Sequence, residues 1–399
     1  MLIIRKEYID RLIMFKDKQL IKVVTGVRRC GKSTLFTIYQ QWLKNNGVAP
    51  EQIISINFED LDYESLCDYK QLYAYLKEQL TEDKKTYIFL DEIQNVENFP
   101  KVLDSLHLKA NVDLYVTGSN AYMLSGEIAT LISGRYVQIE MLPLSFKEYL
   151  EGIGDNTDLS SKYVQYLENS SFPYALELVG NRAAIRDYLE GIYNTIVVKD
   201  IINRKRISDV MMLKSILRFL FDNIGNPLSS KKVADSLTSY GRKIDSKTVE
   251  KYLSTLMESY IIYQAKRYNI KGKEYLKTLE KYYVVDIGLR YMLLGSSSID
   301  SGHVLENIIY LELLRRGYTV YVGKVDEFEV DFVAMNYEST QYIQVALTVR
   351  ESETLARELR PLQAIKDHHP KLLLTMDDDP KTEYNGIVKL NAREWLLNK

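Results

Sequence analysis

The sequence has 399 residues, of which 46% are hydrophobic and 27% are charged. This length exceeds what one hydrophobic core supports, so we expect two or three domains of roughly 100–200 residues each. The composition is that of soluble globular proteins and excludes disordered, collagen-like and coiled-coil classes. The apolar runs are far shorter than the ~18 residues of a membrane span, no apolar signal segment follows Met1, and two cysteines build neither a disulfide framework nor a structural zinc site. We therefore expect a cytoplasmic protein that neither enters a membrane nor is secreted.

The net charge of −2 conceals an uneven distribution along the chain. Residues 201–282 carry 17 Lys and Arg against 8 Asp and Glu, a net charge of +9, which leaves −11 on the rest of the chain. A basic block between acidic segments favours a domain with an anionic partner such as nucleic acid. A solvated lysine-rich surface explains the same charge equally well.

Short apolar runs alternate with helical patterns between Leu20 and about Glu140. The runs are LIKVVTG, IISIN, TYIFL, DLYVTG and YVQIE. Continuous apolar strands separated by helices are typical of a parallel sheet that is covered on both faces. We expect residues 1–143 to form such an α/β domain.

The pattern then becomes helical, and residues 144–206 are predicted to form a helical lid. Three further helices follow, and the third leaves Lys247 and Lys251 outside its apolar face. After them, two strand-like segments flank a Lys-Gly-Lys turn. Three helices and a hairpin predict a winged helix-turn-helix over residues 207–292, and the alternating pattern of residues 293–399 predicts a small α/β domain.

A phosphate-binding loop is predicted at GVRRCGKS, which follows an apolar strand and precedes a helical stretch. Its glycines let backbone N–H groups surround a phosphate at a helix N-terminus, Lys32 reaches the β- and γ-phosphates, and Ser33 offers its hydroxyl to Mg²⁺. Cys30 fills space in the loop and is given no redox role. The residues expected to contact ATP are Gly26, Arg28, Arg29, Cys30, Gly31, Lys32, Ser33, Thr34, Ser119 and Asn120.

Polar residues end the later strands of the same domain. Asp91 and Glu92 follow TYIFL in the Walker B arrangement, where Asp91 serves the Mg²⁺ and Glu92 polarises the attacking water. Ser119 and Asn120 end DLYVTG and suit contact with the γ-phosphate, although a simple turn also accounts for them. Arg135 is a candidate for donating charge to a transition state on a neighbouring subunit; an ordinary surface ion pair is the alternative. The expected catalytic residues are thus Lys32, Glu92 and Arg135, and the expected metal ligands are Ser33 and Asp91.

Taken together, GVRRCGKST, INFED, LDEIQ, TGSN, SGRYVQIEMLPLSF and EVDFV resemble a family of predicted ATPases of the AAA+ superfamily. Members carry a C-terminal domain of unknown function of the DUF4143 type, and the resemblance covers essentially the whole chain. It implies a P-loop NTPase core of the AAA type with strand order 5-1-4-3-2, a helical lid, a winged helix and a restriction-endonuclease-like C-terminal domain. It also implies the roles given above to Lys32, Ser33, Asp91 and Glu92.

The C-terminal domain departs from an active nuclease of this fold, which needs a helix carboxylate, a strand Asp, and an acidic-x-Lys on the next strand. Glu306 and Asp331 suit the first two places, but the third strand offers Gln344-Val345-Ala346. Glu329 substitutes partly for the acid, and the sequence offers no nearby replacement for the lysine. Without it, metal binding and water activation both suffer, so we expect this domain to serve in binding or assembly.

These patterns predict a Mg²⁺-dependent ATPase whose nucleotide state moves a winged-helix and nuclease-like module on DNA, without sequence preference. A homo-oligomer is expected, since Arg135 would act between subunits. Two alternatives remain open: a slow ATP-dependent switch that binds a protein partner through the winged helix, and a nuclease coupled to ATP hydrolysis.

Overall fold

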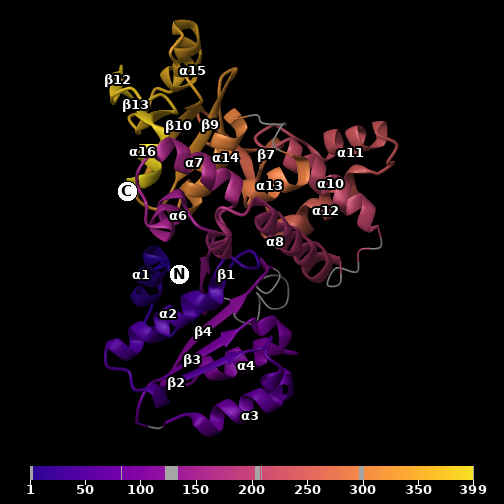
Figure 1. The fold of residues 1–399 in the computed structure, drawn as a ribbon, viewed down its shortest axis with the longest axis vertical. Helices are drawn as coiled ribbons and strands as arrows, with labels where there is room; N and C mark the ends of the chain where they lie inside the picture. Colours follow the sequence, from indigo (N-terminus) through magenta and orange to yellow (C-terminus); the bar gives the residue numbers. More distant parts are fainter. Residues whose placement is uncertain are drawn as a thin grey trace. The chain divides into compact units, whose positions relative to one another are not determined.

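The computed structural model describes residues 3–81, 83–121, 134–202, 207, 209–295 and 301–398 (Figure 1). The chain divides into two compact units. The first contains Met1–Pro143 and Glu258–Tyr260, and the second contains Leu144–Met257 and Ile261–Lys399. In the part of the chain that is described, no helix is both long and apolar enough to cross a membrane.

A five-stranded parallel sheet forms the centre of the first unit. Its strand order, β2-β3-β4-β1-β5, is the order 5-1-4-3-2 expected for an AAA-type core, so this prediction is confirmed. The predicted apolar runs supply all five strands. They are β1 (Ile21–Thr25), β2 (Ile53–Asn57), β3 (Thr86–Asp91), β4 (Val112–Gly118) and β5 (Tyr136–Glu140).

Helices cover both faces of this sheet, which explains why its strands are continuously apolar. On one face, Leu72 of α3 and Leu103 of α4 join the core beneath the strands. On the other, the ring of Tyr39 in α2 packs against Phe89 and Tyr115, with ring centroids 6.1 and 5.3 Å away. The unit's helices are α1 (Lys6–Met14), α2 (Lys32–Asn45), α3 (Tyr69–Gln79) and α4 (Phe99–His107), with 3-10 turns at Pro50–Gln52, Leu61–Cys67 and Ile93–Asn95.

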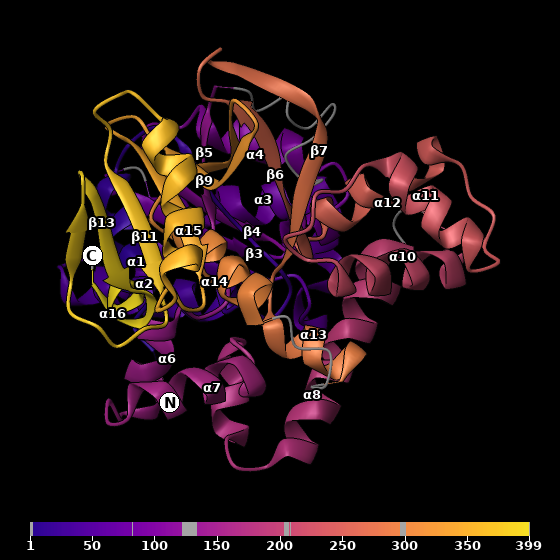
Figure 2. The same cartoon turned by 90° about the horizontal axis from the view of Figure 1, so that it is seen from above.

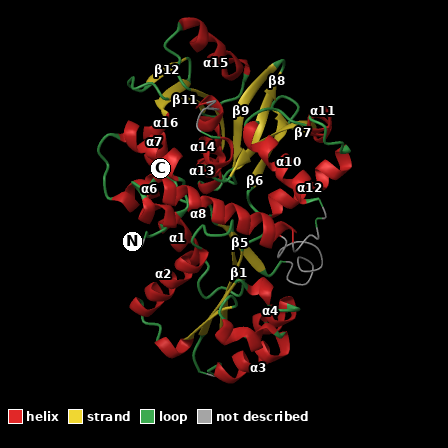
Figure 3. Cartoon of the chain, turned by 45° about the vertical axis from the view of Figure 1, so that its right-hand side comes forward, coloured by secondary structure: helices red, strands yellow, loops and turns green. Residues whose placement is uncertain are grey.

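The second unit begins with helices, as the sequence predicts for residues 144–206 (Figure 3). Ser145 starts the first of them through a capping box: its hydroxyl accepts from the N–H of Glu148, whose carboxylate accepts from the N–H of Ser145. The elements are α6 (Phe146–Ile153), α7 (Leu159–Asn169), a 3-10 segment (Pro173–Leu178), α8 (Arg182–Thr195) and a π-helical turn (Ile196–Ile202).

Three helices and an antiparallel hairpin follow, in the predicted order. Ser229 and Asp245 cap the second and third helices through hydrogen bonds from Lys232 N–H and Thr248 N–H. The elements are α10 (Val210–Asp222), α11 (Ser230–Ser239), α12 (Ser246–Glu258), β6 (Ile262–Asn269) and β7 (Glu274–Val284), after which comes α13 (Ile287–Leu294).

The hairpin does not stand apart from the C-terminal strands. Strand β6 pairs in parallel with β8, so that β6 and β7 complete one eight-stranded sheet of order β12-β13-β11-β10-β9-β8-β6-β7 (Figure 2). The domain boundaries at 206 and 292 stay predictions. The C-terminal elements are α14 (Ser301–Arg315), β8 (Thr319–Val325), β9 (Phe328–Met335), β10 (Thr340–Ala346), α15 (Ser352–Ala364), β11 (Lys371–Thr375), β12 (Thr382–Tyr384), β13 (Ile387–Asn391) and α16 (Ala392–Leu397).

Candidate nucleotide-binding site

The loop between β1 and α2 is built around two glycines. Gly26 has φ +147° and Gly31 has φ +104°, values that other residues rarely adopt. A Cβ atom at Gly26 would lie 2.1 Å from the carbonyl oxygen of Met141, so the position also excludes any side chain. Helix α2 starts directly after Gly31, and its free N–H groups therefore meet the concave side of the loop, as phosphate binding requires.

Lys32 is buried and its ammonium is held inside the loop. Nζ donates to the carbonyl oxygens of Gly26 at 3.0 Å and Val27 at 3.2 Å. It also lies 3.8 Å from Glu92 Oε1. A cation in this position can exchange its carbonyl partners for the oxygens of a bound phosphate.

Asp91 ends β3 beside the start of α2. Its carboxylate accepts hydrogen bonds from the hydroxyl groups of Ser33 and Thr117. Burial raises the pKa of Asp91, although these hydrogen bonds oppose that shift. A hydroxyl and a carboxylate side by side are oxygen ligands of the kind that Mg²⁺ prefers, so the residues present fit this ion.

Glu92 has the left-handed φ of +54° and is buried. Its N–H donates to Thr117 Oγ1 at 2.8 Å, and its carboxylate faces both Lys32 and Gln94. The amide nitrogen of Gln94 donates to Glu92 Oε2 and lies 3.5 Å from Ser119 Oγ. Sequence reasoning missed Gln94; its spacing of two residues from Glu92 is the only local signal.

The remaining predicted ATP contacts lie around the same loop. Ser119 and Asn120 are buried at the end of β4. Arg28 forms an ion pair with Glu59 at 2.7 Å, while Arg29 and Thr34 are exposed. Cys30 is fully buried, which raises the pKa of its thiol.

Arg135 lies at the start of β5 and forms an ion pair with Asp104 of the same chain. Its side chain is 43% exposed. The pair corresponds to the alternative given for this residue. Its role as a finger stays a prediction.

A second group of charged residues lies in the second unit, where the nuclease-like site is expected. The ammonium of Lys281, from β7, lies 2.9 Å from Glu306 Oε1, 3.1 Å from Glu329 Oε1 and 3.6 Å from Asp331 Oδ1. Burial alone would lower the pKa of Lys281, but these carboxylates hold it well above its usual value. The prediction that no lysine lies nearby is therefore wrong. The lysine comes from a strand distant in sequence, which spacing along the chain does not reveal.

This cluster does not have the form of a metal centre. Among the described residues, no group of three or more His, Cys, Asp and Glu is arranged to hold a metal ion. Glu306 Oε1 also accepts from the hydroxyl of Tyr283 at 2.6 Å, and Gln344 donates to Glu358 at 3.0 Å. The ammonium of Lys281 thus supplies the positive charge among these carboxylates.

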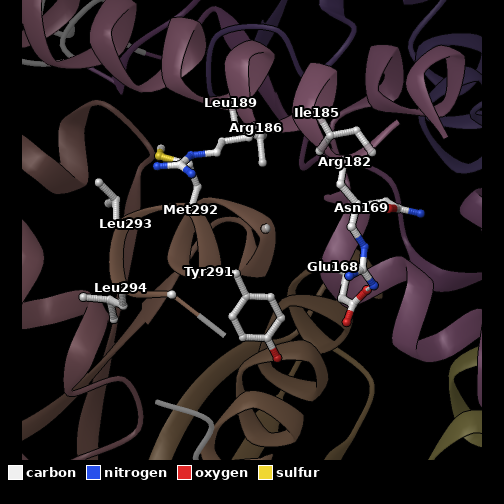
Figure 4. Close-up of a pocket in the computed structure, with 12 residues that line it drawn as sticks. Glu168, Asn169, Arg182, Ile185, Arg186, Leu189, Tyr291, Met292, Leu293 and Leu294 are labelled. Carbon is white, nitrogen blue, oxygen red and sulfur yellow. Dashed lines mark hydrogen bonds and ion pairs between the residues drawn. The ribbon is translucent and has the colours of Figure 1, made fainter. Parts of the chain in front are cut away.

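A pocket of about 570 Å³ lies between α7, α8 and α13 (Figure 4). Ile185, Leu189 and Met292 contribute apolar lining, and an ion pair between Arg182 and Glu168 at 2.7 Å lies at one end. The lining residues include neither a lysine nor an acidic pair, whereas both are present at the loop before α2. The candidate site for nucleotide chemistry is therefore that loop and not this pocket.

Lysines are exposed on the helix predicted to enter a nucleic-acid groove. Lys247 and Lys251 lie on the outer face of α12, and Lys273 is exposed at the hairpin tip. Lys271 is also exposed, but its ammonium pairs with Asp326 at 2.6 Å. Three of the four lysines are thus available to phosphates without breaking a described ion pair.

The sheet order and the loop before α2 define a P-loop domain of the AAA type, and residues 18–150 match the family described as "AAA domain". Residues 160–300 match a family described as "Domain of unknown function (DUF8612)". This match replaces the DUF4143 type that the motifs led us to expect.

Two similar proteins come from a bacterium and an archaeon. An uncharacterized protein of Haemophilus influenzae is 40% identical over 402 residues and covers 99% of both chains. The uncharacterized protein MJ1544 of Methanocaldococcus jannaschii is 30% identical over 367 residues, which cover 87% of this chain and 79% of that protein. The chain belongs to the family of these two proteins.

Among solved structures, the chain is similar to the Walker-type ATPase PABY2304 of Pyrococcus abyssi, with 15% identity, a TM-score of 0.49, and coverage of 72% of this chain and 95% of that one. It is also similar to the Orc1 protein of Aeropyrum pernix in complex with DNA, with 14% identity, a TM-score of 0.34, and coverage of 74% and 93%.

Proposed function

We propose that this protein is a Mg²⁺-dependent ATPase. The observation that carries the proposal is the convergence of Lys32, the Ser33–Asp91 pair and Glu92 at the N-terminus of α2. These groups supply a cation for the phosphates, two oxygen ligands for Mg²⁺ and a base, and Lys32, Asp91 and Glu92 among them are buried.

Each group has a separate task in hydrolysis. Lys32 leaves the carbonyls of Gly26 and Val27 and binds the β- and γ-phosphates. Ser33 and Asp91 would hold Mg²⁺, which neutralises phosphate charge when bound. Glu92 accepts a proton from the water that attacks the γ-phosphorus, while the bond to the ADP oxygen breaks.

The test compares two variants with the wild-type protein. Lys32→Ala removes the cation held in the loop, so it should lose tight ATP binding. Glu92→Gln keeps the shape of the side chain but cannot take a proton, so it should bind ATP and lose turnover by roughly 10²–10⁴-fold. The control is Glu97→Gln, which removes an exposed carboxylate five residues further along and should hydrolyse ATP normally. Hydrolysis by Glu92→Gln at the wild-type rate would show that Glu92 is not the base.

We further propose that the ATPase acts on DNA through α12 and the hairpin, as a winged helix. The support is the net charge of +9 between residues 201 and 282 and the exposed lysines of α12. These lysines can contact phosphates, and α12 has no Arg or Asn side chain that could make two hydrogen bonds to one base. Binding is therefore independent of DNA sequence. The competing proposal is a slow switch that binds a protein partner on this surface. ATP turnover measured with and without duplex, single-stranded and branched DNA separates the two, because only a DNA-acting ATPase is stimulated.

The C-terminal domain is proposed to bind or assemble and not to cleave. The support is the third strand, where Gln344 stands in place of the expected acid and donates to Glu358 at 3.0 Å. Lys281, whose ammonium lies among the carboxylates of Glu306, Glu329 and Asp331, supplies the lysine that a nuclease site needs and therefore favours the nuclease alternative. Incubation of supercoiled plasmid with the protein, ATP and Mn²⁺ should leave the plasmid intact. Cleavage that disappears in Asp331→Asn would establish the alternative of a nuclease coupled to ATP hydrolysis.

A further inference from the structure

The side chain of Gln94 connects two groups of the proposed ATPase site. It lies in the short 3-10 turn Ile93–Asn95 that follows Glu92. The left-handed conformation of Glu92 reverses the chain at that point, and the Gln94 amide can therefore reach back to the carboxylate of Glu92. A residue other than glycine in this conformation carries strain of about 1–3 kcal/mol, which the surrounding structure has to offset. This strained turn brings the side chains of Gln94 and Glu92 into contact.

The orientation of the Gln94 amide follows from charge. Its nitrogen carries two hydrogens, of which one is donated to Glu92 Oε2 and the other points to Ser119 Oγ at 3.5 Å. The reversed amide would place its oxygen against a carboxylate, which is repulsive. The amide N–H of Gln94 therefore faces the Glu92 carboxylate, and the amide oxygen, Oε1, points away from that carboxylate.

That acceptor, Gln94 Oε1, is buried and has no hydrogen-bond partner in the described part of the chain. A buried acceptor without a donor costs about 1–3 kcal/mol. An acceptor kept at this cost beside the site indicates that a bound ligand donates a hydrogen bond to it. A water molecule is a donor of the right size, and the water that attacks the γ-phosphate has to lie beside Glu92.

We infer that Gln94 is a positioning residue for ATP hydrolysis: its N–H groups orient the Glu92 carboxylate toward the attacking water and link that carboxylate to Ser119, and its oxygen accepts a hydrogen bond from this water. The inference rests on the proposed ATPase function.

Gln94→Leu tests this role, since leucine has a similar volume and neither donor nor acceptor. We expect kcat to fall by about 10–100-fold, as is usual for a residue that orients a catalytic group. The affinity for a non-hydrolysable ATP analogue should stay within about two-fold, because Lys32 and Ser33 are unchanged. Gln94→Glu should lower kcat further, because a second carboxylate then faces Glu92 and repels it. The matched control is Gln71→Leu, an exposed position on α3, which should behave as wild type.

Each outcome has one meaning. A Gln94→Leu protein with wild-type kcat overturns the inference. A fall in analogue affinity equal to the fall in kcat also overturns it, because Gln94 then serves the fold of the site and not the base. A wild-type protein that does not hydrolyse ATP rejects the proposed function itself, and that result is seen before any variant is compared.

Discussion

At the scale of single residues, the proposed ATPase site is marked by backbone conformations and buried charges that a structural role alone does not require. Gly26 and Glu92 both have positive φ, and they lie at the ends of neighbouring segments of the same site. Lys32, Asp91 and Glu92 are buried together although each carries an ionisable group. Strain and buried charge are costly, and their concentration at one edge of a sheet is typical of functional sites.

Gly26→Ala should be far more harmful than an alanine at another glycine with positive φ. A Cβ atom at Gly26 would meet the Met141 carbonyl at 2.1 Å, so the loop has to move; overpacking of this kind costs about 1–3 kcal/mol. At Gly47, with φ +88°, no atom lies within 4 Å of the added Cβ, and only the conformational cost of about 1–2 kcal/mol applies. Thermal unfolding and binding of an ATP analogue measure both effects. Gly26→Ala should lose stability and analogue binding, whereas Gly47→Ala should lose only some stability. Equal effects of the two variants would contradict this account of the loop.

Asp331 gives a prediction about the pH dependence of stability. Burial, followed by the charge of Glu306, raises its pKa to about 7 against the opposing charge of Lys281. Between the unfolded value of about 4 and this folded value, the folded chain binds the additional proton, so stability falls as the pH rises toward 7. Asp331→Asn cannot titrate and its oxygen can still accept from Val345 N–H, which donates to Asp331 at 2.9 Å. The variant should therefore gain stability relative to wild type from pH 5 to pH 8, measured by urea unfolding.

A control residue with the opposite shift is available in the same unit. Although burial opposes it, hydrogen bonds from Val349 N–H and the Thr348 hydroxyl hold the pKa of Asp377 below its usual value. Asp377→Asn should thus lose stability at neutral pH, where the carboxylate is charged. If the Asp331→Asn difference does not grow with pH, the raised pKa of Asp331 is incorrect.

At the scale of secondary structure, the sequence predicted what local patterns encode. Alternating apolar runs indicated the five strands of the first unit, and helical patterns indicated the three helices α10, α11 and α12. It did not predict that β6 pairs with β8, because strand pairing between separate segments depends on long-range contacts that no local pattern records. Lys281 was missed for that reason: it lies 25 residues before Glu306 in the chain, but its ammonium is 2.9 Å from that carboxylate.

Gln94 was missed for another reason. Its role depends on the positive φ of Glu92, which directs the Gln94 side chain back toward the carboxylate. Glutamic acid rarely adopts this conformation, so the sequence gives no indication of it. The P-loop and Walker B residues could be predicted because their spacing along the chain is characteristic. The groups that orient them could not be predicted in this way.

Helix α12 and the hairpin give a prediction about DNA binding. Replacing Lys247, Lys251, Lys271 and Lys273 by alanine should weaken binding to all sequences alike, since these lysines are placed to contact phosphates. Each lost phosphate contact should also lower the slope of log affinity against log salt by about 0.9. Lys271 should contribute least, because its ammonium already pairs with Asp326. A titration of labelled duplex DNA over a range of salt concentrations measures both quantities.

The matched control replaces four exposed lysines of the first unit, Lys6, Lys18, Lys44 and Lys77, by alanine. It changes the net charge by the same amount and should leave the slope nearly unchanged if contact and not total charge determines binding. Undiminished DNA affinity in the α12 and hairpin variant, at low salt and with intact folding, would favour the protein-partner switch.

At the scale of the whole molecule, the open question is whether one chain contains a complete ATPase site. The groups at the P-loop supply a cation that binds phosphate, oxygen ligands for Mg²⁺ and a base. In the same loop, Arg28 is paired with Glu59 and Arg29 is exposed, and both stay predicted ATP contacts. An arginine from a neighbouring subunit would add positive charge at the transition state, and Arg135, at the surface and exposed by 43%, is the predicted donor.

If Arg135 acts on a neighbouring chain, Arg135→Ala should bind ATP normally and hydrolyse it more slowly, by ~10³-fold or more, since arginines of this kind contribute roughly 10³–10⁵-fold to kcat. Mixing Arg135→Ala with Lys32→Ala should then restore activity, because some interfaces join an intact P-loop on one chain to an intact Arg135 on the other. The control is Arg182→Ala, which breaks a comparable exposed ion pair with Glu168 and should not affect turnover. Sedimentation of the wild-type protein with ATP and its analogue determines whether the chains associate under assay conditions. A fully active monomer, or two inactive variants whose mixture stays inactive although they associate, would mean that Arg135 serves only its pair with Asp104.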